Sequence, residues 1–297
     1  MPSSQKQILG AVFVLLIIAL GVGIYVKFNS KPAPVALTPV VEEVVKKEIK
    51  PKTEVIGKSV QGRSIESYTF GTGTKKLTFI GGIHGGYEWN SVLLAYMFID
   101  YLNANPKVVP DTLTVQIIPS MNPDGLYKVT GKTGRFTKAD VSTDEKILAS
   151  GRFNANDVDL NRNFDCKWQP KSTWRSKEVS AGTAPFSEPE SKVIQNFMLK
   201  HSPTAVVFWH SQSNAVYASK CEKGILPGTL TLMDTYALAS GYKAMKTFDA
   251  YQVTGAVEDW LASINIPAVT VELKTHEDTD WEQNLKAVTA LFEYYKK

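Results

Sequence analysis

Short apolar, β-rich runs alternate with longer helical stretches along most of this chain. Such alternation is typical of an α/β fold, in which helices pack on both faces of a sheet. We therefore expect a mixed, largely parallel twisted sheet with helices on both faces. The predicted elements are, in chain order, residues 77–83, 88–102, 113–118, 188–200, 205–209, 268–273 and 281–295.

The last stretch shows helical spacing along its whole length. Its apolar side chains fall on one face, and Lys and Glu lie on the other. This stripe predicts contact with the core of the domain, not a cofactor site. Its members are Trp281, Leu285, Val288, Leu291, Phe292 and Tyr295.

A different pattern opens the chain. Residues 8–26 (ILGAVFVLLIIALGVGIYV) carry no charge and are long enough to cross a bilayer. We expect residues 1–7 to be a short tail and residues 8–26 to be a transmembrane anchor. A cleaved signal peptide is the alternative, although no small-residue cleavage site closes the run. Lysines flank the run on both sides, so charge does not fix its orientation. We favour a single-pass membrane protein with its main domain outside the cytoplasm.

Residues 27–52 mix Pro, Val, Glu and Lys without sustained periodicity, which predicts a semi-extended spacer. Residues 1–52 hold seven lysines and three acidic side chains, so the remainder carries 26 basic and 26 acidic ones. A neutral domain offers no electrostatic footprint for nucleic acid, and the basic tail is better explained by an anionic membrane surface. Residues 53–297 suffice for one well-buried domain, which we expect to be a monomer.

Two cysteines, Cys166 and Cys221, lie in turn-rich segments that contain lysine, and we expect them to lie outside apolar cores. Their positions lack metal-ligand spacing. In an oxidising compartment we expect them to form a disulfide, and two unrelated free thiols are the alternative.

Three strand-like runs lead into residues that can bind a metal or move a proton. These residues are His84, His210 and Glu272, and Glu88 follows His84 across a Gly-Gly turn. Open α/β sheets place ligand sites at the carboxyl ends of strands. Two imidazoles and one carboxylate leave the fourth zinc position to water, and the second carboxylate is free to act as a base. Taken singly, however, His84 and Glu88 also fit a surface pair or a helix cap, and His210 fits a hydrogen-bonded core residue.

Five segments strengthen this interpretation: GGIHGGYEWN (81–90), NPDG (122–125), VDLNRNF (158–164), HSQS (210–213) and VTVEL (269–273). In this order they resemble the motifs of the zinc carboxypeptidase family, the peptidases typified by carboxypeptidase A. The resemblance extends from about Ser59 to Lys297. It implies one zinc ion per chain, bound by His84, Glu88 and His210.

The resemblance also implies that Glu272 takes a proton from the activated water and delivers it to the leaving amine. One feature departs from the family pattern, because three residues separate His84 from Glu88 where the family has two. We expect the extra glycine to be absorbed in the turn.

Further matches concern the substrate. Asn161 and Arg162 match the residues that hold the terminal carboxylate, and a guanidinium beside an amide suits that capture. A surface salt bridge is the alternative role for Arg162. Arg152 resembles the arginine that polarises the scissile carbonyl in bacterial members, and Arg135 is its rival for this role.

The segment AYQVTGAVEDW (250–260) resembles the mobile segment that closes over substrate, which would make Tyr251 the lid residue. An ordinary half-buried tyrosine is the alternative. Glu258 falls where the family reads the last side chain of the substrate, and a carboxylate there favours a basic or amine-bearing residue. It also fits an exposed charge at a helix start.

Three functions follow from these observations. The first is a membrane-anchored zinc carboxypeptidase that removes C-terminal residues, with basic ones preferred. The second acts on cell-wall murein peptides, at γ-D-glutamyl-diamino acid bonds. The third is a catalytically inactive, membrane-tethered peptide-binding module that has lost zinc through the altered spacing of His84 and Glu88. Such a module would have no use for a general base such as Glu272.

Overall fold

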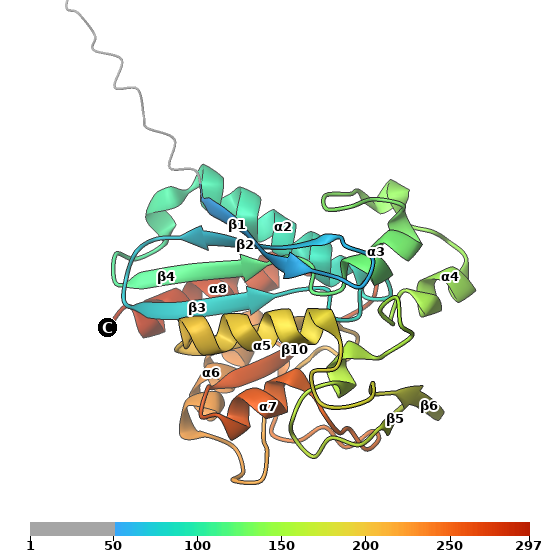
Figure 1. Cartoon of the computed structure of the whole chain (residues 1–297). Coiled ribbons are helices and arrows are strands. Elements are labelled where there is room, and N and C mark those ends of the chain that lie inside the picture. The colour runs from blue at the N-terminus through green and yellow to red at the C-terminus, as the bar shows by residue number, and fades with distance from the viewer. Residues whose placement is uncertain (1–50) are drawn as a thin grey trace, which may run out of the picture. The chain divides into compact units, whose positions relative to one another are not determined.

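A computed structural model describes residues 51–297 (Figure 1). Its main sheet contains eight strands in the order β1-β2-β4-β3-β7-β10-β8-β9. In that order the strands are β1 (Lys52–Lys58), β2 (Ser64–Phe70), β4 (Leu113–Ile118), β3 (Lys75–Ile80), β7 (Ala205–Ser211), β10 (Ala268–Leu273), β8 (Ala215–Ala218) and β9 (Lys243–Met245).

The centre of the sheet is parallel and its flanks are mixed. Strands β4, β3, β7 and β10 pair in parallel, as do β8 and β9. The pairs β1–β2, β2–β4 and β8–β10 are antiparallel. The predicted mixed α/β sheet is therefore confirmed. A separate two-stranded hairpin consists of β5 (Lys171–Trp174) and β6 (Lys177–Ser180).

Helices cover both faces of the main sheet (Figure 1). Buried residues of α2, α6 and α8 belong to one core cluster, and those of α5 and α7 belong to a second. The helices are α2 (Trp89–Ala104), α3 (Pro123–Thr130), α4 (Glu145–Ser150), α5 (Pro189–His201), α6 (Pro227–Ser240), α7 (Val257–Ser263) and α8 (Trp281–Tyr295), with short 3-10 turns at η1 (Pro106–Val108), η2 (Lys138–Asp140) and η3 (Leu160–Arg162).

The period-two alternation of the central strands decides which side chains face each cluster. In β7, Val207 and Trp209 join the α2/α6/α8 cluster, whereas Val206 and Phe208 join the α5/α7 cluster. Continuing the alternation puts His210 on the α5/α7 face, at the end of the strand. By the same rule Glu272 lies on that face of β10, because Val269, Val271 and Leu273 pack on the opposite one.

Several element boundaries differ from the sequence prediction. Elements 113–118, 268–273 and 281–295 have the predicted ends, but the strand expected over 77–83 already ends at Ile80. The two glycines after Ile80 turn the chain out of the sheet. The flanking strands β1, β2, β8 and β9 and helix α6 lie in segments for which no element was predicted.

The predicted tail, the anchor over 8–26 and nearly all of the spacer lie outside the described residues. The last spacer residue, Lys52, begins β1. Within residues 51–297, none of the helices has the length and apolar content needed to span a bilayer.

Cys166 and Cys221 are joined by a disulfide bond. The expectation that they lie away from apolar cores is wrong, because both are buried in the α5/α7 cluster with Phe164 and Trp260. Their turn-rich segments fold back onto apolar side chains from distant parts of the chain, which the local composition does not reveal.

Candidate active site

The turn between β3 and α2 presents His84 and Glu88. Gly85 has φ +47°, and a Cβ there would lie 2.5 Å from the carbonyl oxygen of Gly151. A Cβ on Gly86 would lie 2.4 Å from a side chain of α3. Only glycine suits these positions, so the three-residue spacing is accommodated by a tight turn. Glu88 is the residue immediately before the first turn of α2.

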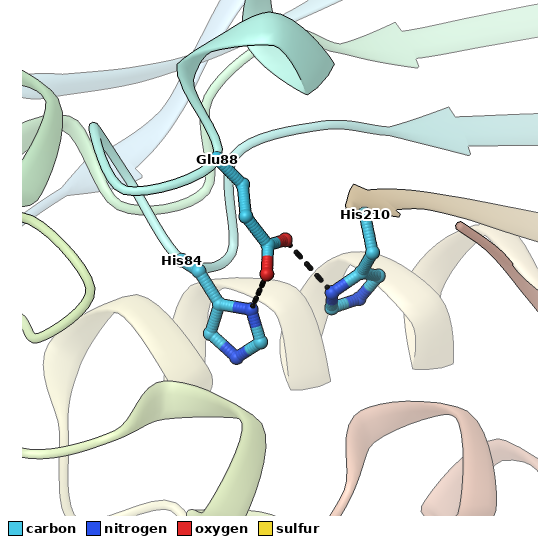
Figure 2. A group of neighbouring side chains, drawn as sticks. All are labelled: His84, Glu88 and His210. Atoms are coloured by element: carbon cyan, nitrogen blue, oxygen red, sulfur yellow. Dashed lines mark hydrogen bonds and ion pairs between the residues drawn. The ribbon is translucent and has the colours of Figure 1, made fainter. Parts of the chain in front are cut away.

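Glu88 lies between two imidazoles (Figure 2). Its Oε1 is 2.8 Å from Nδ1 of His84, and its Oε2 is 3.1 Å from Nδ1 of His210. One ligand atom from each of the three residues lies within 4.8 Å of the others. All three side chains are almost completely buried. The structure thus brings together the three predicted metal ligands, and it brings them from two separate strand ends.

The electrostatics of this cluster suit a divalent cation. Burial by itself would raise the pKa of Glu88, but the imidazoles of His84 and His210 hold it well below its usual range. Burial lowers the pKa of His210, but the Glu88 carboxylate outweighs it and raises the pKa to about 9. The buried atoms His84 Nε2 and His210 Nε2 have no hydrogen-bond partner among residues 51–297, and the contact of Glu88 Oε2 with Nδ1 of His210 is an ion pair without hydrogen-bond geometry. A metal ion that replaces the shared protons would satisfy such a donor set.

Asp159 supports this cluster, and sequence reasoning did not identify it. Its Oδ2 accepts hydrogen bonds from Nε and Nη2 of Arg152 at 3.0 and 2.8 Å, and its Oδ1 lies 3.4 Å from Nε2 of His84. Burial would raise its pKa, but Arg152 and then Arg162 hold it well below the usual range. A carboxylate behind a ligating histidine fixes the ring orientation. The available signal was its place in the VDLNRNF segment, two residues before Asn161.

Arg152 and its rival Arg135 occupy very different places. Arg152 is buried, and its Nη1 lies 3.8 Å from Oε1 of Glu88. The Arg135 side chain is 50% exposed and forms two hydrogen bonds to Asp100, at 2.8 and 2.7 Å. Arg135 also lies over the ring of Tyr96, and it does not line the cavity that opens beside His84 and His210. Arg152, and not Arg135, therefore lies beside the candidate metal ligands.

A cavity of about 310 Å³ opens beside the metal ligands. It collects the remaining residues that the sequence singled out and adds a second wall from β8 and the segment before α7. Its lining residues are His84, Arg152, Asn161, Arg162, His210, Tyr217, Ala218, Ser219, Lys220, Phe248, Tyr251, Gln252, Val253, Ala256, Glu258, Asp259, Thr270 and Glu272.

Asn161 and Arg162 lie in the η3 turn at the wall of this cavity. Arg162 is 2% exposed and donates hydrogen bonds to the carbonyl oxygens of Asn161 and Thr173, at 2.6 and 3.0 Å. A surface salt bridge is therefore not its role. The Asn161 side chain accepts a hydrogen bond from the backbone N–H of Val257 at 2.9 Å. Main-chain contacts thus hold both side chains of the pair in place.

Glu258 is 4% exposed, so it is not the exposed helix-start charge that the sequence left open. Its Oε1 accepts hydrogen bonds from Thr270 and Asn161, whereas its Oε2 is buried without a partner among residues 51–297. Burial also raises the pKa of the next residue, Asp259, to about 7. Lys220 lines the same cavity and donates its Nζ to Oγ1 of Thr247 at 3.1 Å.

Glu272 and Tyr251 complete the lining. Glu272 is aligned with His210 across the parallel β7–β10 pair. Burial, and then the Glu88 carboxylate, raise the pKa of Glu272 to about 8. Tyr251 is half-buried against Phe248, with ring centroids 4.8 Å apart, and burial raises its pKa. A carboxylate with high proton affinity beside a metal-binding cluster is suited to proton transfer.

Two buried imidazoles and a carboxylate at the carboxyl end of the sheet, with a second carboxylate alongside, define a metal-dependent hydrolase site. The sequence also matches a family model, described as zinc carboxypeptidase, over residues 46–288. The chain belongs to the zinc carboxypeptidase family, whose members are zinc-dependent peptide hydrolases. The predicted family and its zinc cofactor are confirmed.

Similar proteins include, by name, an endopeptidase and a carboxypeptidase. The chain is 25% identical to gamma-D-glutamyl-L-diamino acid endopeptidase 1 of Lysinibacillus sphaericus, over 73% of this chain and 59% of that protein. It is 26% identical to carboxypeptidase B of Helicoverpa zea, over 73% of this chain and 55% of that protein. The chain therefore spans less than two thirds of the length of these relatives.

Among solved structures, murein-tripeptide amidase MpaA from Escherichia coli O157 has the same fold. The TM-score is 0.61 at 22% sequence identity, and the match covers 83% of this chain and 94% of that one.

Proposed function

We propose that this chain removes the C-terminal residue of a peptide and prefers a leaving residue with an amine on its side chain. The observation that supports this proposal is a single cavity, which is lined by His84, His210, Glu272 and the pair Asn161–Arg162. An exopeptidase needs these groups around one pocket, because the terminal carboxylate must be held while the adjacent peptide bond is broken.

His84, Glu88 and His210 would hold the zinc ion. The chemistry that zinc supplies in such a site is Lewis acidity, which makes water acidic near neutral pH and polarises a carbonyl group. Glu272 takes the proton of the attacking water and later delivers it to the leaving amine. The raised proton affinity of this carboxylate lets it keep the proton between the two transfers.

Arg152 stabilises the negative charge that develops on the carbonyl oxygen. Asp159 holds its guanidinium through two hydrogen bonds, so the charge is preorganised and needs no rearrangement during the reaction. Tyr251 lies at the cavity wall next to Phe248, and we assign it to the cover over bound substrate.

Asn161 and Arg162 bind the terminal carboxylate, because a buried guanidinium beside an amide matches its two oxygens. Glu258 then selects the side chain of the leaving residue. Its Oε2 has no partner among residues 51–297, so an ammonium group of the substrate would satisfy it. This favours lysine, arginine or another amine-bearing residue over an apolar one.

A second candidate is cleavage of γ-D-glutamyl-diamino acid bonds in murein peptides. The observation in its favour is Lys220, a cationic residue that lines the same cavity as Glu258. A diamino acid with a second carboxylate would match both charges, whereas lysine would match only one. The name of the Lysinibacillus sphaericus relative agrees with this alternative.

We further propose that the domain works outside the cytoplasm and is held at the membrane by residues 8–26. The apolar run and the Cys166–Cys221 disulfide support this location, because disulfides persist in oxidising compartments. The alternative of an inactive binding module has little support, since Glu272 would have no function in it.

The test compares two substrates with the purified full chain. One is a peptide that is blocked at its N-terminus and ends in a lysine with a free carboxylate. The other is a γ-D-glutamyl-diamino acid tripeptide. Each is incubated with the enzyme as purified, with a chelator, and with zinc added back. We expect zinc-dependent release of a single terminal residue, and the faster substrate distinguishes the two candidates. No turnover of either substrate would contradict the proposal, and a chain that also binds no zinc would favour the binding module.

A further inference from the structure

An aromatic cluster lies beside the metal ligands but outside the set of residues that line the cavity. The ring of Tyr87 is 5.1 Å from that of Trp174, on the β5–β6 hairpin, and 4.6 Å from that of His276. Tyr87 and His276 are half-buried, and Trp174 is buried. Tyr87, Trp174 of the hairpin and His276 therefore form an aromatic wall next to the reacting centre.

Covalent neighbours and direct contacts tie this wall to the site. Tyr87 immediately precedes the metal ligand Glu88. Nδ1 of His276 lies 2.7 Å from Oγ of Ser211, which immediately follows the ligand His210. The guanidinium carbon of Arg152 lies 4.6 Å from the centroid of the Trp174 ring. The wall thus adjoins both the ligands and the arginine assigned to the scissile carbonyl.

Arg175 occupies the outer side of the wall, at the turn of the hairpin. Its Nη2 donates a hydrogen bond to the Tyr87 hydroxyl at 3.2 Å, and its guanidinium carbon lies 5.7 Å from the Trp174 ring centroid. The side chain is exposed, and no carboxylate of residues 51–297 forms a salt bridge with it. The Tyr87 hydroxyl and the Trp174 ring thus hold the Arg175 guanidinium in place. Because no carboxylate of residues 51–297 pairs with it, the guanidinium is available to bind an anion.

The direction of the substrate decides which part of it meets Arg175. The leaving residue and its carboxylate occupy the cavity, so the acyl portion must pass Arg152 and continue outside the cavity. The wall of Tyr87 and Trp174 adjoins Arg152 there. We propose that Arg175 binds a carboxylate on the residue that supplies the acyl group, so that the enzyme prefers an acidic residue immediately before the scissile bond. This inference rests on the proposed function.

Two kinds of acyl residue carry such a carboxylate. An α-linked aspartate or glutamate presents its side-chain carboxylate, whereas a γ-linked glutamate presents its free α-carboxylate. Both offer the same chemistry to a guanidinium, but they place it at different distances from the scissile carbonyl. The experiment therefore includes both linkages.

The test measures kcat/KM for blocked peptides that share one terminal residue and differ in the residue before it. The variants at that position are α-linked Glu, Gln and Lys, and γ-linked Glu with its matched γ-linked amide. For the wild-type protein we expect each carboxylate substrate to exceed its neutral partner by about three- to tenfold, with the larger ratio marking the linkage that fits. The ratio should shrink as salt is added.

Arg175→Gln should bring the carboxylate-to-amide ratio close to one, and Arg175→Glu should reverse the order so that Lys exceeds Glu. A folding defect lowers all rates together and cannot reverse a preference. Lys177→Gln, another exposed cation of the same hairpin, should keep the wild-type ratio. An unchanged ratio in both Arg175 variants would overturn the inference while the proposed function stands. If the wild type with zinc cleaves none of the peptides, the proposed function fails and this inference with it.

Discussion

His210 and Glu272 are Cα partners in the parallel pair of β7 and β10, and their side chains point to the same face of the sheet. Both strands are buried at the centre of the sheet, so their spacing is set by the backbone hydrogen-bond ladder and not by a mobile loop. A ligand and a base held on rigid neighbouring strands are preorganised for proton transfer at the metal. The proposed roles of the site residues lead to three predictions, and the buried carboxyl of Asp259 leads to a fourth.

Glu272→Gln should abolish turnover and leave zinc bound. The amide keeps the shape of the side chain but cannot accept the proton of the attacking water, and loss of a general base costs at least about 10²-fold in kcat. Zinc content by elemental analysis and kcat on a lysine-terminated peptide would be measured together. A variant with near-normal kcat would show that the proton goes elsewhere.

Glu88→Ala should lose zinc. It removes the carboxylate that contacts both imidazoles. Losing a residue that only hydrogen-bonds to a metal ligand costs up to ~100-fold in metal affinity, so we expect losing a ligand to lower the zinc affinity by more than that. Competition with a chromogenic chelator gives the affinity. Glu282→Ala, which removes an exposed carboxylate from the first turn of α8, is the matched control and should bind zinc normally. Equal affinities in the two variants would exclude Glu88 as a ligand.

Arg152→Gln should lower kcat by about 10²- to 10³-fold, the usual cost of removing a donor to a developing oxyanion. Arg135→Gln should change kcat by less than about twofold, because this residue pairs with Asp100 on the surface and does not line the cavity. Steady-state kinetics of both variants at saturating zinc separates the two arginines. A loss of kcat in Arg135→Gln as large as that in Arg152→Gln would contradict the geometry.

Asp259→Asn should flatten the pH dependence of stability. Burial raises the pKa of this carboxyl from 3.8 to about 7 in the folded protein. The folded state therefore binds the proton more tightly, so its stability falls as the pH rises from about 4 to 7 and levels off above. The free energy of unfolding of the asparagine variant lacks this fall. At pH 8 it exceeds that of the wild type by at most ~4 kcal/mol, and the partial exposure of the group reduces this difference.

Urea unfolding of wild type and Asp259→Asn at pH 4.5, 6 and 8 measures this difference, with zinc equally loaded in both. Comparing the two proteins at each pH cancels the other titrating groups. A constant difference in the free energy of unfolding across the three pH values would mean that Asp259 has an ordinary pKa.

The amino-acid sequence already predicted the fold class and the candidate metal ligands. Both depend on local signals, because a buried strand followed by a turn leaves its last polar residue at the edge of the sheet. His84, Glu88, His210 and Glu272 were therefore singled out from local pattern, and the resemblance to the zinc carboxypeptidase motifs implied their roles. The sequence did not show whether Glu88 could reach His84 across the extra residue. The structure shows that it does, because a tight turn with a positive φ at Gly85 takes up that residue.

Only the tertiary structure decided what surrounds these residues. It places Arg152, and not Arg135, beside Glu88, brings Asp159 behind His84, buries Glu258 and the two cysteines, and sets the β5–β6 hairpin with Arg175 against Tyr87. Each of these facts depends on contacts between segments far apart in the chain. Local periodicity and composition report which face of an element is buried, but they carry no information about which distant loop covers it.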